Sequence, residues 1–221
     1  MRLAGSSEAP KLRPMRPIIA LAAALSLSSC ADAPGTRFID TLETSSWKAI
    51  ATDQDKDRMR NWRTALEEGR AQAEASGHGA ELAALGPLAE LDSGLELGNL
   101  PDGDYRCRTI KLGWKGDPGL GYVAYPYFTC RIRPEKELLG FAKLTGSQRP
   151  VGLIFPDDDL RRVFLGTLVL GDEDYAMRYG SDPERDMAGM LQRIGDNQYR
   201  LLLPNPAFES KIDIIELVPA T

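Results

Sequence analysis

Side chains that could do chemistry are sparse in this chain. Its 221 residues include a single histidine, His78, and three cysteines. His78 stands between two glycines in a predicted loop, whereas the histidine of a serine hydrolase is fixed by a carboxylate beside the nucleophile. Ser45-x-x-Lys48 matches one motif of penicillin-recognising enzymes but lacks the partner motifs. No catalytic residue is indicated, and we expect a protein that is not an enzyme.

The acidic residues do not form a recognisable metal site. The clusters at 157–159 and 172–174 offer carboxylate oxygens of the kind that Ca²⁺ prefers. Both fall where the tips of hairpins are expected, and aspartates are common in turns for conformational reasons. Zinc would need several histidine or cysteine ligands, and the sequence has no glycine-rich phosphate-binding loop. We therefore expect no metal and no cofactor.

Cys30 ends a short segment with a recognisable order of residues. Basic residues precede an apolar run from Ile18 to Leu27, which is too short to cross a bilayer of roughly 30 Å as a helix. Leu27-Ser28-Ser29-Cys30 then resembles the lipobox of bacterial lipoproteins. The resemblance implies that residues 1–29 are a signal peptide and that the acylated Cys30 is the mature N-terminus. A plain cleaved signal is the alternative, and Met15 could be the true start.

The lipobox also implies where the protein lies. An acylated Cys30 anchors the chain to a membrane, and residues 30–37 then form a short lipidated tether. Ala31, and not aspartate, follows the cysteine. By analogy with enteric lipoproteins, this favours the outer membrane, with the folded part facing the periplasm. With a net charge of −5, the chain has no reason to bind nucleic acid, which needs a clustered basic surface.

Cys107 and Cys130 remain as an even pair in an oxidising compartment. Their sequence neighbourhoods both look like strands, and the intervening Asp117-Pro118-Gly119-Leu120 has the signature of a type II turn. A hairpin centred on Pro118-Gly119 places Cys107 directly opposite Cys130, within the separation that a disulfide needs. We expect a disulfide, with two buried free thiols as the alternative.

Residues 38–100 are predicted to be helical. Thr52, with Asp55 three residues later, has the spacing of a capping box and predicts a helix start. One face of this helix then collects Met59, Trp62, Leu66, Gly69 and Ala73. The glycines around His78 end the helix, and a second, shorter helix is expected to follow as far as Gly86-Pro87. The predicted arrangement is a helical hairpin.

Residues 101–221 are predicted to be a β domain, because turn residues recur between short apolar runs. The expected strands lie near 104–112, 121–133, 138–145, 151–156, 162–170, 174–179, 186–194, 198–203 and 212–218. No helix of crossover length separates them, so they must be mostly antiparallel. The expected fold is α+β: a helical hairpin followed by an up-and-down, lipocalin-like β-barrel of eight or nine strands. A two-sheet sandwich is the alternative.

Several short motifs together resemble a family of uncharacterised proteobacterial envelope proteins. The motifs are Tyr105-Arg106-Cys107-Arg108, Lys111-Leu112-Gly113, Cys130-Arg131, the segment from Lys143 to Arg149, Gly152 and Phe164-Leu165-Gly166. The resemblance implies a domain of unknown function that covers roughly Trp47 to Pro219. It supplies no activity, so it implies no catalytic residues.

Arginines gather on the predicted hairpin. If Cys107 and Cys130 share one face, strand alternation sends four arginines to the other. These are Arg106, Arg108, Arg131 and Arg133, with Asp104 expected opposite Arg133. Guanidinium groups suit carboxylate or phosphate recognition, so this patch could bind an anionic envelope component or the acidic face of a partner. An outer face of ordinary surface salt bridges is the alternative.

The segment from Lys143 to Pro150 is the second candidate. Lys143, Gln148 and Arg149 place polar groups at a strand end, and barrel rims often contact ligands. An ordinary turn is the alternative. The sequence thus predicts a non-enzymatic, lipid-anchored periplasmic binding or interaction protein of the cell envelope. An envelope hydrolase with unidentified catalytic residues and a protein inhibitor of a lytic enzyme are the alternatives.

Overall fold

The structure is a computed structural model that describes residues 46–116, 119 and 121–220. The predicted signal peptide, Cys30, the tether and most of the predicted turn at 117–120 lie outside these residues. Within the described part, no helix is long and apolar enough to cross a membrane.

Short helices occupy the first part of the described chain. They are α1 (Trp47–Ile50), α2 (Asp53–Arg60), α3 (Trp62–Ala75) and α4 (Gly79–Ala84), followed by the 3₁₀ turn η1 (Gly86–Leu88). Thr52 begins α2 as predicted, because its hydroxyl accepts a hydrogen bond from the Asp55 backbone N–H at 3.2 Å. Asn61 then ends α2 and begins α3, so the predicted helix is divided. The hairpin arrangement stays a prediction.

The strands form a closed antiparallel barrel. They are β1 (Gly103–Leu112), β2 (Tyr122–Ala124), β3 (Phe128–Glu135), β4 (Leu138–Lys143), β5 (Gln148–Asp158), β6 (Arg161–Leu170), β7 (Asp186–Gly195), β8 (Gln198–Pro204) and β9 (Ile212–Pro219). Strands β3 to β9 pair in chain order, and β1 closes the ring by pairing with both β3 and β9. The extra strand β2 pairs with β1. This closure confirms the predicted antiparallel barrel over the sandwich.

Two strand predictions need correction. The segment 174–179 is not a strand, because β6 pairs directly with β7 and leaves no edge between them. The segment 121–133 is split into β2 and β3 at Tyr125-Pro126-Tyr127. Pro126 has no backbone N–H to donate to a ladder, and the chain changes its pairing with β1 across this break.

The disulfide between Cys107 and Cys130 is present, but not in the predicted register. Tyr105 lies opposite Cys130, and Cys107 lies opposite Phe128. The register therefore differs from the predicted one by two residues, so the cysteines are diagonal neighbours. Their Cα atoms are still only 5.8 Å apart, because side chains of diagonal residues on one face remain within reach. The bond closes a segment whose ends are 23 residues apart and that contains β2.

Side chains fill most of the barrel interior. One buried cluster takes members from each of the eight ring strands, among them Cys107, Cys130, Phe141, Phe164, Tyr199 and Leu217. Phe164 lies across two paired glycines, Gly152 of β5 and Gly166 of β6. A Cβ atom at either glycine would come within 2.6 Å of the Phe164 ring. These glycines therefore make room for an aromatic core, as small barrels require.

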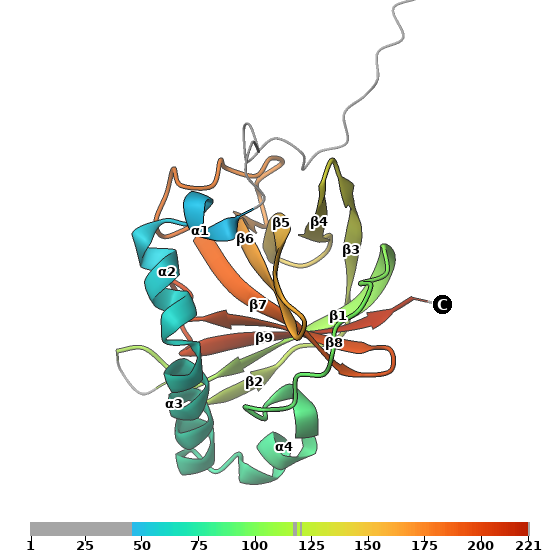
Figure 1. The fold of residues 1–221 in the computed structure, drawn as a ribbon. Helices are drawn as coiled ribbons and strands as arrows, with labels where there is room; N and C mark the ends of the chain where they lie inside the picture. Colours follow the sequence, from blue (N-terminus) through green and yellow to red (C-terminus); the bar gives the residue numbers. More distant parts are fainter. Residues whose placement is uncertain (1–45, 117–118, 120, 221) are drawn as a thin grey trace, which may run out of the picture. The chain divides into compact units, whose positions relative to one another are not determined.

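The helices pack on the outside of the ring. A second buried cluster joins Leu66 and Leu88 of the helical part to Ile110, Met190 and Ile214 on outward-facing strand positions. Figure 1 shows α2 and α3 lying along one side of the barrel, where α2 contacts β7 and α3 contacts β1 and β8. Each strand of the ring thus contributes side chains to the buried interior, and several strands also pack against the helices on the outside.

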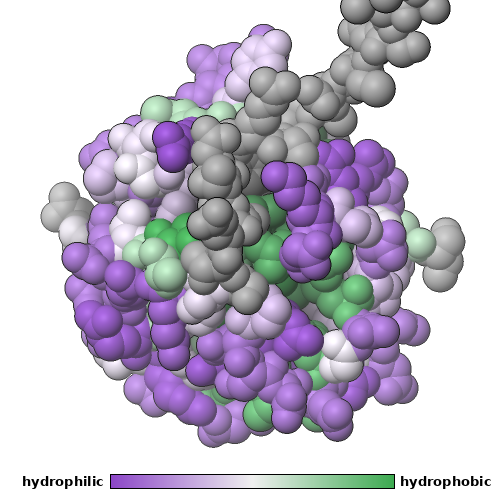
Figure 2. Space-filling model, turned by 45° about the horizontal axis from the view of Figure 1, so that its top comes forward, coloured by the Kyte–Doolittle hydropathy of each residue, from purple (hydrophilic) through white to green (hydrophobic). Residues whose placement is uncertain are grey.

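One face of the described part is mostly hydrophilic. Figure 2 shows hydrophobic residues gathered near the centre of this face, in the region of β4 and β5. This local apolar area contrasts with the charged surface around it.

Candidate functional site

The predicted arginine patch lies on the outer face of the barrel, and its charges have local partners. Arg131 Nε donates to Asp104 at 2.6 Å, and Arg108 Nε donates to Glu216 at 2.5 Å. Arg133 pairs with Glu135 at 2.6 Å. Asp104 therefore lies opposite Arg131, and its predicted position opposite Arg133 is wrong because of the shifted register.

Arg106, the remaining member of the patch, packs over the ring of Tyr127, with 4.5 Å from guanidinium carbon to ring centroid. Such a cation–π contact stabilises the arginine without removing its charge. Three ion pairs and one stacked guanidinium resemble an ordinary solvated outer face. Binding of an anion by this patch stays a prediction.

The other candidate segment lies at one end of the barrel, which we call the mouth. Strands β1, β4, β6 and β8 end there, and the longer connecting loops gather around it. A cavity of about 210 Å³ opens at the mouth. Its lining includes Lys111, Tyr125, Phe128, Lys143, Gln148 and Glu209. Two lysines thus face one small cavity, and its remaining lining is aromatic, polar and, at Glu209, acidic.

Lys111 is a buried cation with two carboxylate partners. Its Nζ lies 3.0 Å from Asp213 Oδ2 and 3.1 Å from Glu209 Oε2. Ser210 donates a hydrogen bond to the other oxygen of Asp213 at 2.5 Å. Burial opposes the charged form of Lys111, but the two carboxylates outweigh it and raise the pKa of this amine above its ordinary value. Lys111 therefore stays positively charged.

Lys143 is buried without such compensation. Its side chain is on the same face of β4 as Phe141, and only 5% of the residue is exposed. Nζ donates to the backbone oxygen of Gln148 at 2.9 Å and lies 4.0 Å from the ring centroid of Phe128. No carboxylate of the described residues lies within ion-pair distance of it. Burial, then the charges of Lys111 and Arg149, lower the pKa of Lys143 to about 8.

The structure brings together two of the three residues named in this candidate segment. Lys143 and Gln148 both line the cavity. Arg149 points to the other face of β5, where its guanidinium donates to the backbone oxygens of Gly146, Leu170 and Glu173 at 2.8–3.1 Å. Arg149 therefore holds two loops of the mouth together and is not part of the lining.

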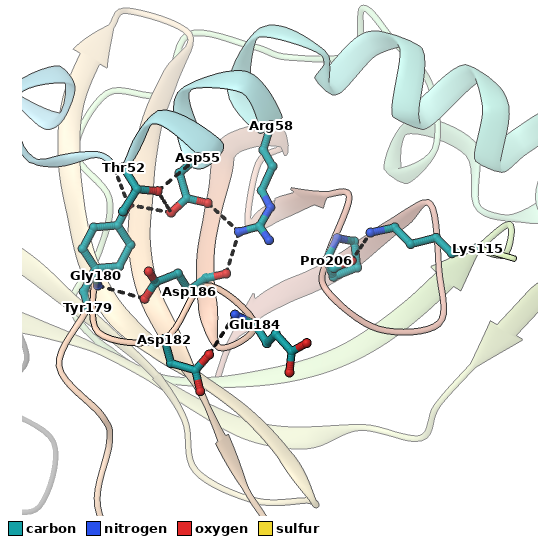
Figure 3. Close-up of polar contacts among 10 residues, drawn as sticks. All are labelled: Thr52, Asp55, Arg58, Lys115, Tyr179, Gly180, Asp182, Glu184, Asp186 and Pro206. Carbon is teal, nitrogen blue, oxygen red and sulfur yellow. Dashed lines mark hydrogen bonds and ion pairs between the residues drawn. The ribbon is translucent and has the colours of Figure 1, made fainter.

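An open groove of about 500 Å³ runs beside α2, next to the mouth. Arg58, Asn61, Lys115, Glu184 and Asn205 contribute to its hydrophilic lining. Lys115 donates a hydrogen bond to the backbone oxygen of Pro206 on its far side (Figure 3). The groove is larger than the mouth cavity, but it is open, and its two cations, Arg58 and Lys115, already have hydrogen-bond partners.

A buried polar network forms one wall of the groove. Arg58 NH1 donates to Asp55 Oδ1 and to the backbone oxygen of Asp186, both at 2.6 Å. Tyr179 donates its hydroxyl hydrogen to Asp55 Oδ2 at 2.6 Å (Figure 3). The Asp186 side chain accepts from the Gly180 backbone N–H at 2.9 Å. Burial raises the pKa of Asp186, although this backbone hydrogen bond and Arg58 act against it. The network fastens α2 to the loop before β7.

Comparison with known proteins gives the family but no activity. A family model described as "Domain of unknown function (DUF4893)" matches residues 47–217. This chain belongs to that family. The match confirms the predicted domain of unknown function and nearly the whole of its predicted span. No curated protein and no solved structure matches the DUF4893 chain.

Arg200 is a buried group of the DUF4893 barrel that the sequence did not single out. It is fully buried on β8. Its guanidinium donates to the backbone oxygens of Pro87, Leu88 and Glu90 and to the side chain of Gln192. Burial lowers its pKa to about 10, with the charge of Glu90 acting against this. Arg200 therefore remains charged at neutral pH and fastens the segment after η1 to the barrel.

The remaining chemical candidates of the DUF4893 domain stay minor. His78 stands just before α4 and stacks on Tyr122, with ring centroids 5.5 Å apart. In the described part of the chain, no three histidine, cysteine or acidic side chains converge as metal ligands would. Lys111, Asp213 and the α2 network were missed because their partners lie far apart in the sequence. Inward-facing charges on predicted barrel strands were the available signal for Lys111 and Asp213.

Proposed function

We propose that this DUF4893 protein is a lipid-anchored, non-enzymatic periplasmic binding protein that takes a small organic anion into the barrel mouth. The observation that carries the proposal is Lys143, a buried cation in a cavity with no carboxylate of the described residues close enough to pair with it. The Gln148 oxygen and the Phe128 ring contact Nζ but carry no net charge. A buried charge without an opposite charge beside it is costly, so an anionic group placed beside Nζ would be stabilised there.

The surroundings of Lys143 support a ligand with a small apolar part. Tyr125 and Phe128 line the same cavity and offer aromatic surface. A volume of about 210 Å³ is below the range of drug-sized sites, which favours a ligand of few heavy atoms. Because the interior below the mouth is filled, a lipocalin-like use of this barrel would keep the ligand at the rim.

The proposed location rests on the sequence. The lipobox at Cys30 supports acylation, an outer-membrane anchor and a periplasmic position for the folded part, and the proteobacterial origin belongs to the same resemblance. The disulfide Cys107–Cys130 agrees with an oxidising compartment. A hydrolase would need a nucleophile held beside a general base, and among the described lining residues of the mouth no side-chain hydrogen bond joins such a pair.

Calorimetric titration of the mature protein with benzoate tests the proposal. We expect saturable binding that Lys143→Met weakens at least tenfold, because charge-assisted hydrogen bonds contribute about 1.5–3 kcal/mol. Lys136→Met is the matched control, since Lys136 is exposed at the β3–β4 turn, away from the mouth. Equal binding by both variants, or no binding by the wild type, would contradict the proposal.

A protein partner at the mouth is the second candidate. Tyr125, Leu144 and Phe208 are large apolar residues near this end that remain 40%, 40% and 39% exposed. Exposed apolar groups that gather at one site often mark an interaction surface. A photo-crosslinking residue at position 125 should then capture a specific partner in native envelopes, whereas one at the exposed Leu160, in the β5–β6 turn at the opposite end of the barrel, should not.

A further inference from the structure

The two lysines of the mouth cavity have opposite electrostatic surroundings. Asp213 of β9 and Glu209 of the β8–β9 loop hold Lys111 as a cation. Lys143 shares the cavity with this cation and packs on the Phe128 ring of β3. The charges of Arg149, on the other face of β5, and of Asp213 act on Lys143 only at longer range. Two titratable groups whose surroundings shift their pKa values in opposite directions are typical of sites that need an acid and a nucleophile side by side.

We propose that Lys143 is a covalent site: its amine reacts reversibly with a small aldehyde or ketone that enters the mouth, and forms an imine at Nζ. This inference rests on the proposed function, because it needs a mouth that admits small molecules. It adds that the ligand is an aldehyde or ketone. It also adds a covalent step, imine formation, that binding of an anion does not require.

Burial and position make the amine suitable for this step. At a pKa of about 8, about a tenth of the Lys143 amines are neutral at pH 7, whereas an ordinary lysine with a pKa of about 10.4 has less than about a thousandth. Only the neutral amine is a nucleophile. Nζ lies at the wall of the cavity and above an aromatic ring, so a carbonyl compound in the cavity would meet it directly.

The reaction balances without an oxidant or reductant. The lone pair of Nζ forms a bond to the carbonyl carbon while the carbonyl π bond breaks, and the oxygen takes up the proton that the nitrogen releases. The resulting carbinolamine then loses its hydroxyl with the second N–H proton as one water molecule, which leaves the C=N bond. The ammonium of Lys111 in the same cavity stabilises the negative charge that develops on the oxygen. Water reverses the reaction.

Reductive trapping tests the inference on the full mature protein. The protein is incubated with propanal and sodium cyanoborohydride at pH 7, and modified lysines are mapped by mass spectrometry. We expect labelling of Lys143 to be at least tenfold faster than that of Lys136 at pH 7. Equal rates at both lysines, or no labelling at Lys143, would overturn the inference.

A second variant separates the inference from simple accessibility. Lys111→Gln removes the neighbouring cation, so the pH midpoint of Lys143 labelling should move upward, while labelling of Lys136 stays unchanged. An unshifted midpoint in folded protein would rule out the role given to Lys111. Propanal carries no charge and benzoate carries no aldehyde or ketone. Labelling without benzoate binding would therefore refute only the anion proposal, and benzoate binding without labelling would refute only the imine.

Discussion

At the residue scale, buried charges decide what this protein can do. Lys111 and Lys143 share one cavity, yet two carboxylates reach the first and none in the described chain reaches the second. The difference arises from strand position, since Asp213 pairs opposite Lys111 across β9 and β1. The same side-chain type therefore serves as a fixed cation at one position and as the proposed ligand-binding amine at the other.

Asp186 gives a prediction for the dependence of stability on pH. Its folded-state pKa is raised, so the folded protein binds this proton more tightly than the unfolded chain does. The stability contributed by the proton is fully present below the unfolded pKa of about 3.9 and is lost as the pH rises through the folded value. Asp186→Asn should therefore gain stability relative to the wild type on going from pH 4 to pH 7.

Urea unfolding at these two pH values checks this expectation. Asparagine keeps an oxygen that can accept from the Gly180 N–H, and Arg58 contacts the backbone of Asp186, so the network should survive. Asp174→Asn, at an exposed position, is the control and should differ from the wild type equally at both pH values. A constant difference for Asp186→Asn would contradict the assignment.

At the element scale, the sequence predicted strands well and their pairing less well. The predicted strand 104–112 is Gly103–Leu112 in the structure, and 198–203 is Gln198–Pro204. Alternation and turn residues are local properties, so they can be read from a short segment. Register depends on how a connection folds. Strand β2 already pairs with β1 three residues away from the predicted register, and after the break at Pro126 the difference for β3 is two residues. The disulfide was nevertheless predicted correctly, because it needs only a shared face and nearby strands.

Arg200 gives a prediction for the contact between the helical part and the barrel. Arg200→Met would leave the backbone oxygens of Pro87, Leu88 and Glu90 without this donor. Unpaired buried polar groups each cost about 1–3 kcal/mol, so we expect a loss of roughly 3 kcal/mol in the free energy of unfolding. Chemical denaturation measures it. Arg200→Lys keeps the charge but has fewer donors, so its free energy of unfolding should lie between those of the wild type and Arg200→Met. A loss of less than about 1 kcal/mol for Arg200→Met would refute this role.

At the scale of the whole molecule, the folded domain and the predicted lipid anchor occupy different parts of the sequence. The DUF4893 match begins at residue 47, after the lipobox and the predicted tether. Lipid anchoring would therefore restrict where the barrel mouth meets its ligand without changing the site itself. This separation allows the anchor and the site to be tested independently.

Cys30→Ser tests the anchor. Because serine cannot take the place of the acylated cysteine, we expect the protein to move from the membrane fraction to the soluble fraction, with benzoate binding unchanged. Cell fractionation and immunoblotting measure this, and Ser28→Ala, which leaves the cysteine in place, should remain in the membrane fraction. A Cys30→Ser protein that stays with the membrane would contradict lipidation.

The sequence by itself determined the barrel class, the cysteine pair and the presence of polar residues at the end of β4. The strands and their turns follow from residue alternation and turn residues, which act over a few residues. The cysteine pair follows from the even count of cysteines and the predicted oxidising compartment. Only the tertiary structure decided that, within the described part of the chain, two carboxylates pair with Lys111 and none with Lys143, and that Arg149 turns away from the cavity. Charge compensation depends on distances between strands that are far apart in the chain, and ring closure between β1 and β9 is what brings those strands together.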